Sequence, residues 1–130
     1  MEALRRALEA RDAEAVEALL AEDCVFRSPA LFKPYAGRAA TMVFLRAVME
    51  VFEGFHYTRT FTDDAGGGSV MMFAAEVGGK SLEGVDVISV GDDGLVTEFR
   101  VMVRPMTGLV ALAEAMAPRV SGPLWALAVD

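Results

Sequence analysis

The stretch SLEGVDVISVGDDGLVTEFRVMVRP, residues 81–105, contains two apolar segments on either side of the turn GDDG. Glycine and aspartate are typical of tight turns, and apolar residues alternate along both flanking segments. The stretch therefore predicts a β-hairpin with strands at 81–90 and 95–105. Its unusual feature is Asp86, an acid placed among valines and isoleucine in the first strand.

The same period-two pattern extends toward the N-terminus. FHYTRTFT (55–62) and SVMMFAAEV (69–77) are separated from each other and from the hairpin by glycine-rich turns. Successive strands with short connections predict an antiparallel meander. After it, Thr107 is expected to cap a helix over 108–117, which Pro118 ends, leaving 118–130 as an apolar tail around Trp125.

The first half of the chain has helical spacing. Apolar residues at period 3.6 predict two short helices, at 2–10 and 13–20, with Asp12 capping the second. DCVFRSP, residues 23–29, is expected to be a short strand followed by a loop. RAATMVFLRAVMEVF, residues 38–52, predicts a longer helix that is apolar on most sides, and Gly54 is expected to stop it.

Two strands are apolar at consecutive positions, as in VMMFAA and VMV, so both faces of the sheet need cover. Helices can cover one face, and the chain is too short to cover the other. A homodimer that packs sheet against sheet is therefore expected, with Val85, Val87, Met102 and Arg104 on the dimer face.

Composition excludes several functional classes. The 130 residues form one expected domain, 1–130, whose net charge of −7 argues against binding nucleic acid. A single cysteine and a single histidine argue against a metal site, and no apolar run is long enough for a membrane span. Richness in Ala and Arg with little Lys indicates a GC-rich bacterial genome, and a cytoplasmic location is expected.

The order of these elements resembles the nuclear transport factor 2-like superfamily, including the SnoaL-like polyketide cyclases and the ketosteroid isomerases. The matching segments are EALLAEDCVFRSP, YAGRAATMVFL and GVDVISVGDDGLVTEFRVMVRP. The resemblance implies an α+β, cystatin-like cone, in which a curved antiparallel sheet wraps on N-terminal helices around an apolar pocket. Matched by position, the pocket would be lined by Leu4, Phe26, Ser28, Phe44, Phe73, Asp86, Ile88, Phe99, Val101 and Val103.

The enzymes of this superfamily each need residues that this chain lacks. The resemblance places Leu4 where ketosteroid isomerases have a tyrosine and Ser28 where they have the base, and only Asp86 keeps the acid. Chemistry like that of limonene epoxide hydrolase needs an arginine where Gly84 stands, and a carboxamide. The chain has no Asn and no Gln, and its one histidine is fewer than a scytalone dehydratase-like site requires.

Asp86 and His56 are the catalytic candidates. Desolvation would raise the pKa of Asp86 so that it exchanges a proton near neutrality; alternatively, Asp86 bonds a neighbouring hydroxyl and only fixes its strand. His56 could be a base or a partner for Asp86, but the sequence does not fix its face. Tyr35 and Tyr57 could supply a hydroxyl to the mouth of the pocket, but packing in a loop or at an edge is the leading expectation, and Cys24 is expected to be a buried, inert thiol.

Three functions remain open. The leading expectation is a cofactor-free homodimer that binds a small apolar molecule, with no metal, membrane or nucleic-acid partner. The alternative is an isomerase, cyclase or dehydratase that acts on a polyketide-, terpenoid- or steroid-like substrate with Asp86 as acid and base. The third is a dimeric interaction module whose core is filled. An open pocket above about 300 Å3 favours the first two, and one plugged by Phe and Met favours the third.

Overall fold

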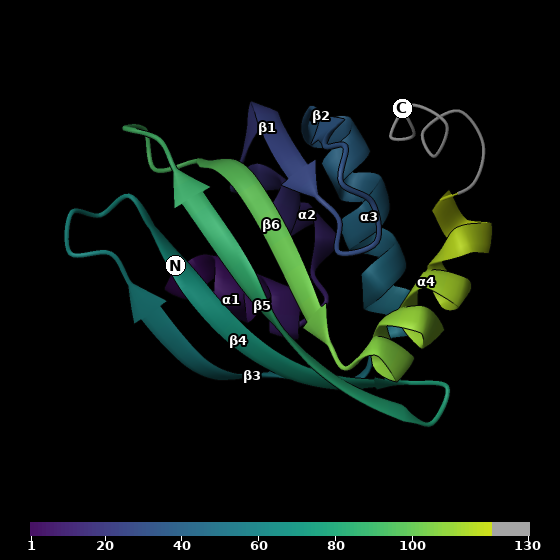
Figure 1. Cartoon of the computed structure of the whole chain (residues 1–130). Helices are drawn as coiled ribbons and strands as arrows, with labels where there is room; N and C mark the ends of the chain where they lie inside the picture. The colour runs from purple at the N-terminus through teal and green to yellow at the C-terminus, as the bar shows by residue number, and fades with distance from the viewer. Residues whose placement is uncertain (121–130) are drawn as a thin grey trace.

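A computed structural model describes residues 1–120 and shows a curved sheet wrapped around helices (Figure 1). The elements follow the order α1 (Glu2–Glu9), α2 (Ala13–Ala18), β1 (Leu20–Arg27), β2 (Tyr35–Ala36), α3 (Arg38–Val51), β3 (Glu53–Thr62), β4 (Gly68–Val77), β5 (Lys80–Val90), β6 (Val96–Arg104) and α4 (Met106–Val120). The α+β cone expected from the sequence is confirmed.

The predicted meander forms most of the sheet. Strand order is β2-β1-β6-β5-β4-β3, and β3 to β6 pair antiparallel in sequence order. The first strand departs from the antiparallel expectation, because β1 pairs parallel with β6 while it pairs antiparallel with β2. The sheet is therefore mixed at one edge.

Alternation along β5 gives the sheet two different faces. Asp86 and Ile88 point inward and are 5% and 1% exposed, whereas Val85 and Val87 remain partly exposed on the outward face. The inward face packs against the helices in a core that includes Phe73 on β4. This division places the acid of the hairpin on the concave side of the sheet.

Several boundaries differ from those expected. The strand predicted at 23–29 begins at Leu20, because apolar Leu19 and Leu20 fit a strand as well as a helix, and the Val96 amide donates to the Leu19 carbonyl. Residues 35–36, expected in a loop, form β2. The helix predicted over 38–52 ends at Val51, since Phe52 is already extended.

The last helix is longer than expected. It continues through Pro118 to Val120, so the prediction that Pro118 ends it is wrong. Arg119 bonds Glu50 of α3 at 3.0 Å, and Val120 is 1% exposed, so packing on α3 offsets the backbone hydrogen bond that proline removes. Of the predicted tail, 121–130 lies outside the described residues. In the described part of the chain, no helix combines the length and hydrophobicity of a membrane span.

Candidate functional site

A largely apolar cavity lies between the concave face of the sheet and helices α1, α3 and α4. The side chains that line it are Leu8, Arg11, Phe26, Ser28, Pro29, Ala30, Phe44, Leu45, Val48, Met49, Phe52, Phe55, Tyr57, Phe73, Asp86, Phe99, Val101, Leu109, Leu112, Ala113 and Met116. The empty space is about 850 Å3 when the open mouth is included, and about 70 Å3 of it can hold the centre of a water molecule. Since one water needs roughly 10–15 Å3 by the second measure, the cavity has room for a few water molecules between its side chains.

Side chains at helical spacing on α3 form one wall of the cavity. Phe44 and Val48 are four residues apart on α3, so they lie one above the other on the same face, and Phe52 follows directly after the helix. The last helix, α4, packs against α3 and contributes Leu112 and Met116 with the same spacing. The two helices thus present apolar side chains to the cavity because each has an apolar stripe at period 3.6.

Aromatic rings make up much of the lining. Phe26 stacks on Phe44 with ring centroids 5.3 Å apart and lies 5.9 Å from Phe99. Also in the lining, the ring centroids of Phe55 and Phe73 lie 5.4 Å apart. Such rings favour flat, apolar ligands because each offers a large rigid surface at little cost in side-chain entropy.

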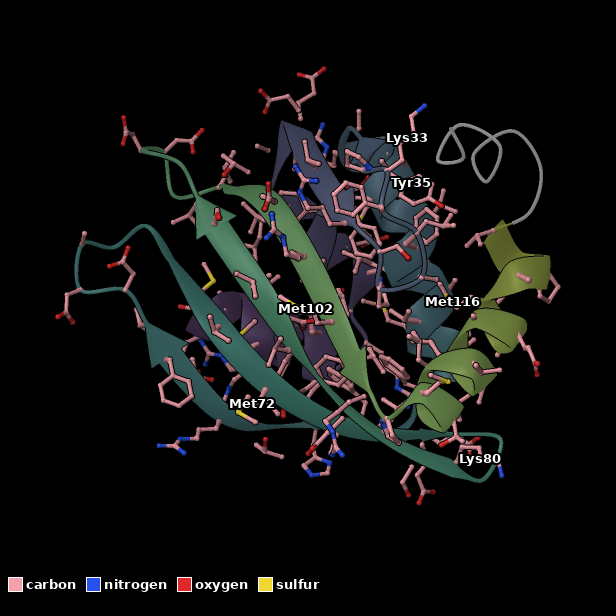
Figure 2. The ribbon with its side chains drawn as sticks, in the orientation of Figure 1. Lys33, Tyr35, Met72, Lys80, Met102 and Met116 are labelled. Atoms are coloured by element: carbon pink, nitrogen blue, oxygen red, sulfur yellow. The ribbon has the colours of Figure 1, made fainter. Side chains whose placement is uncertain are left out.

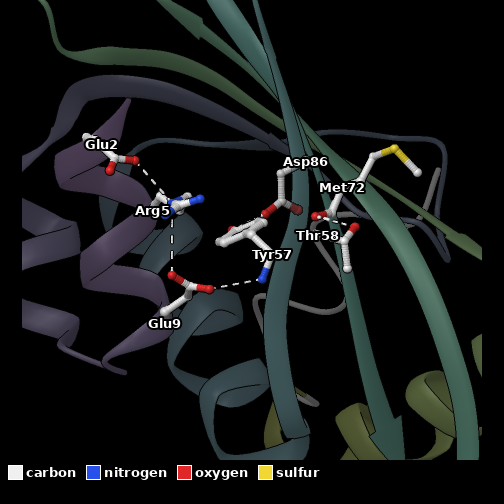
Figure 3. Close-up of polar contacts among 7 residues, drawn as sticks. All are labelled: Glu2, Arg5, Glu9, Tyr57, Thr58, Met72 and Asp86. Carbon is white, nitrogen blue, oxygen red and sulfur yellow. Dashed lines mark hydrogen bonds and ion pairs between the residues drawn. The ribbon is translucent and has the colours of Figure 1, made fainter.

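Asp86 is the one carboxyl group among the lining residues, and it is paired with Tyr57. The Tyr57 hydroxyl donates a hydrogen bond to Oδ2 of Asp86 at 2.5 Å (Figure 3). The two residues lie on β3 and β5 with β4 between them, and both are buried. Within residues 1–120, Oδ1 of Asp86 accepts no hydrogen bond, which leaves it available to a ligand.

The protonation states of this pair follow from its burial. Desolvation raises the pKa of Asp86 to about 7, and the hydrogen bond from Tyr57 opposes that rise. Desolvation also raises the pKa of Tyr57, and the neighbouring carboxyl raises it further. Tyr57 therefore stays protonated as a donor, while Asp86 gains and loses a proton near neutrality.

The backbone of Tyr57 is held in place from α1. Its amide donates to Oε2 of Glu9 at 3.0 Å, and Arg5 lies 4.0 Å from the other carboxylate oxygen (Figure 3). Arg5 also pairs with Glu2 at 3.1 Å. This chain of contacts positions Tyr57, and so it orients the hydroxyl that meets Asp86.

The structure brings most of the predicted pocket residues together. Those that line the cavity are Phe26, Ser28, Phe44, Phe73, Asp86, Phe99 and Val101. Leu4 and Ile88 are buried elsewhere in the core, and Val103 lies outside the cavity lining. Alternation predicts the face of a strand, but it does not say how far along the strand the cavity extends.

His56 does not enter the cavity. Its ring is exposed, and Nδ1 lies 2.9 Å from the Gly54 carbonyl oxygen. Alternation on β3 points His56 away from the side on which Tyr57 lies. The imidazole is therefore not placed to meet Asp86.

Two polar residues of the lining, Tyr57 and Arg11, were not among the pocket residues predicted from the sequence. Tyr57 was predicted to pack at an edge, although its phase with Phe55 on β3 indicated a shared face. Arg11 lines the cavity from the turn after α1, where no periodic pattern applies.

Cys24 lies in the core as expected, at 0% exposure, with its sulfur 3.4 Å from the Thr41 hydroxyl. In residues 1–120, no three His, Cys, Asp or Glu side chains are grouped to hold a metal.

Solved structures with the same architecture come from several bacteria. A steroid delta-isomerase from Pseudomonas aeruginosa is 44% identical, with a TM-score of 0.84 over 88% of this chain and 83% of that chain. An uncharacterised cystatin-like protein from Silicibacter pomeroyi is 32% identical, with a TM-score of 0.87 over 97% and 88%. A Mycobacterium tuberculosis protein in complex with estradiol-17beta-hemisuccinate is 22% identical, with a TM-score of 0.62 over 80% and 94%, which shows the fold alone.

No curated protein matches the chain. The SnoaL-like domain family matches residues 1–99, which include α1 to β5 and the first part of β6. That range contains Asp86, Tyr57 and the aromatic lining, and the structures related to it are steroid isomerase and cystatin-like proteins. The chain belongs to the SnoaL-like family within the nuclear transport factor 2-like superfamily.

Proposed function

We propose that this protein binds a small apolar molecule in the cavity and holds one hydrogen-bonding group of that molecule against Asp86 and Tyr57. The observation that carries the proposal is a buried carboxyl with one free oxygen in an otherwise apolar, aromatic-lined space. A neutral Asp86 donates a hydrogen bond to a ligand carbonyl, and it accepts one from a ligand hydroxyl.

The related structures support a flat polycyclic ligand. One is named as a steroid delta-isomerase, and another contains estradiol-17beta-hemisuccinate. Polyketides, terpenoids and steroids share the flat apolar body and sparse oxygens that suit aromatic walls. The proposed ligand class is therefore a polyketide-, terpenoid- or steroid-like ketone or alcohol.

Blocking the cavity tests this proposal. Ala113 lines the cavity from α4, so Ala113→Phe should fill the space and abolish the rise in melting temperature that steroid ketones and alcohols give the parent. Glu114→Phe is the matched control, because Glu114 is exposed on the same helix and should leave binding intact. Equal ligand-induced shifts in the parent and Ala113→Phe would place binding elsewhere and reject the proposal.

A second candidate function, catalysis by Asp86, is favoured by its pKa of about 7. A carboxyl near half-protonation can take a proton from one ligand carbon and return it to another, or protonate a leaving hydroxyl. Chemical analysis of the ligand recovered after incubation with the protein distinguishes binding from catalysis. Unchanged ligand means binding alone, and an isomer or dehydrated product that Asp86→Asn no longer forms means an isomerase, cyclase or dehydratase.

Homodimerisation through the outward face of the sheet is part of the proposal. Met72 and Met102 lie there beside Val85 (Figure 2), and Arg104 and Glu83 form a 2.6 Å ion pair at their border. An apolar centre with charged residues around it is typical of a protein interface. A second copy would cover this surface with the same residues by twofold symmetry.

Light scattering tests the dimer. The parent should have twice the 13.9 kDa chain mass at micromolar concentration, and Met102→Glu should have the mass of one chain, because an unpaired charge would be buried in the interface. Val110→Glu is a matched control, since Val110 on α4 is 48% exposed and Met102 is 49% exposed. A monomeric parent, or a dimeric Met102→Glu, would contradict this interface.

A further inference from the structure

Arg11 is the one cationic side chain among the residues that line the cavity. It follows α1 in a left-handed backbone conformation, with φ at 57°. Its two terminal nitrogens donate to the carbonyl oxygens of Met49 at 2.9 Å and Phe52 at 2.7 Å, at the end of α3. Both of those residues also line the cavity, so the guanidinium is fixed beside it.

The charge of Arg11 is not neutralised by a neighbour. Within residues 1–120 no carboxylate forms an ion pair with it, although the chain carries a net charge of −7. The two acids closest in sequence bond elsewhere. Glu9 accepts the Tyr57 amide, and Asp12 accepts the Ala15 amide at the start of α2.

The two hydrogen bonds to the end of α3 use only some of the N–H donors of the Arg11 guanidinium. Five N–H groups are available on an arginine, and the two carbonyl oxygens of α3 occupy two of them. The others remain available on an exposed side chain that borders the cavity. Arginine presents such donors in a planar arrangement that matches a carboxylate or sulfonate.

We propose that Arg11 binds the anionic end of an amphipathic ligand whose apolar body occupies the cavity. This inference rests on the proposed function and narrows its ligand class to apolar carboxylates and sulfonates. Such a ligand has two polar contacts, an oxygen against the Asp86–Tyr57 pair and an anion against Arg11. The aromatic walls contact the apolar body between these two groups.

Two fluorescent probes with one skeleton test the inference. 8-Anilinonaphthalene-1-sulfonate carries an anion, and N-phenyl-1-naphthylamine is the same molecule without it. The parent should bind the sulfonate more tightly than the amine, and Arg11→Met should lose roughly tenfold in affinity for the sulfonate only. Arg11→Lys, which keeps the charge, should retain most of the preference.

Controls distinguish an effect of Arg11 from an effect of the protein's net charge. They also distinguish failure of this inference from failure of the proposed function. Arg6→Met removes the same charge from α1 at a residue that does not line the cavity, and it should leave both affinities unchanged. If the amine binds but Arg11→Met leaves the sulfonate affinity unchanged, this inference is overturned and the proposed function stands. If neither probe binds the parent, or Ala113→Phe binds both as well as the parent does, both are overturned.

Discussion

The stability of Asp86→Asn relative to the parent should increase by about 3 kcal/mol as the pH rises from 5 to 8. The pKa of Asp86 is raised to about 7 in the folded protein, from 3.8 in a solvated carboxyl. The folded state then binds more protons than the unfolded chain between these values, so the parent loses stability as pH rises. The full loss is about 4 kcal/mol, most of it above pH 5.

Asparagine is the matched replacement because it has the shape of the protonated carboxyl and still accepts the Tyr57 hydroxyl. Urea unfolding at pH 5, 6, 7 and 8 measures both proteins, and Asp92→Asn, which removes an exposed carboxyl, is the control. Parallel stability profiles for the parent and Asp86→Asn would show that Asp86 is not desolvated. That result would also remove the reason to regard it as a proton-transfer group.

The meander could be predicted because its signals are local. Each strand is a short segment rich in apolar residues, and each turn between them contains glycine, so the order of strands follows from the sequence alone. The two-residue strand β2 carries too little pattern to be seen. The extension of α4 through Pro118 depends on contacts with α3, including the bond from Arg119 to Glu50, which no local pattern reports.

Only part of the candidate site could be predicted from such local patterns. Alternation on β5 put Asp86 on the inward face, as the structure does. A hydroxyl partner for Asp86 was one expected alternative, but Tyr57 could not be identified as that partner, because the two residues are separated by a strand and by 29 positions in the chain. The register between β3 and β4 also shifts after Tyr57, so counting along strands does not align the pair.

Tyr57→Phe should destabilise the protein by about 1.5–3 kcal/mol at pH 9 and by about 1 kcal/mol at pH 5. The Tyr57 hydroxyl donates to Asp86 at 2.5 Å and lowers the pKa of that carboxyl, so its removal raises the pKa of Asp86 beyond about 7. The phenylalanine variant then continues to lose stability at pH values where the parent has stopped losing it, because the pH window of loss ends at the folded pKa.

A double-mutant cycle isolates this bond. Tyr57→Phe in the Asp86→Asn background removes only a neutral hydrogen bond, so the coupling between the two sites should be larger at pH 9 than at pH 5. Tyr35→Phe is the control, since the buried Tyr35 hydroxyl has no hydrogen-bond partner within residues 1–120 and its loss should cost little. A coupling that does not change with pH would mean that Tyr57 bonds a carboxyl of fixed charge. Asp86 would then hold its strand in place without exchanging protons with a ligand.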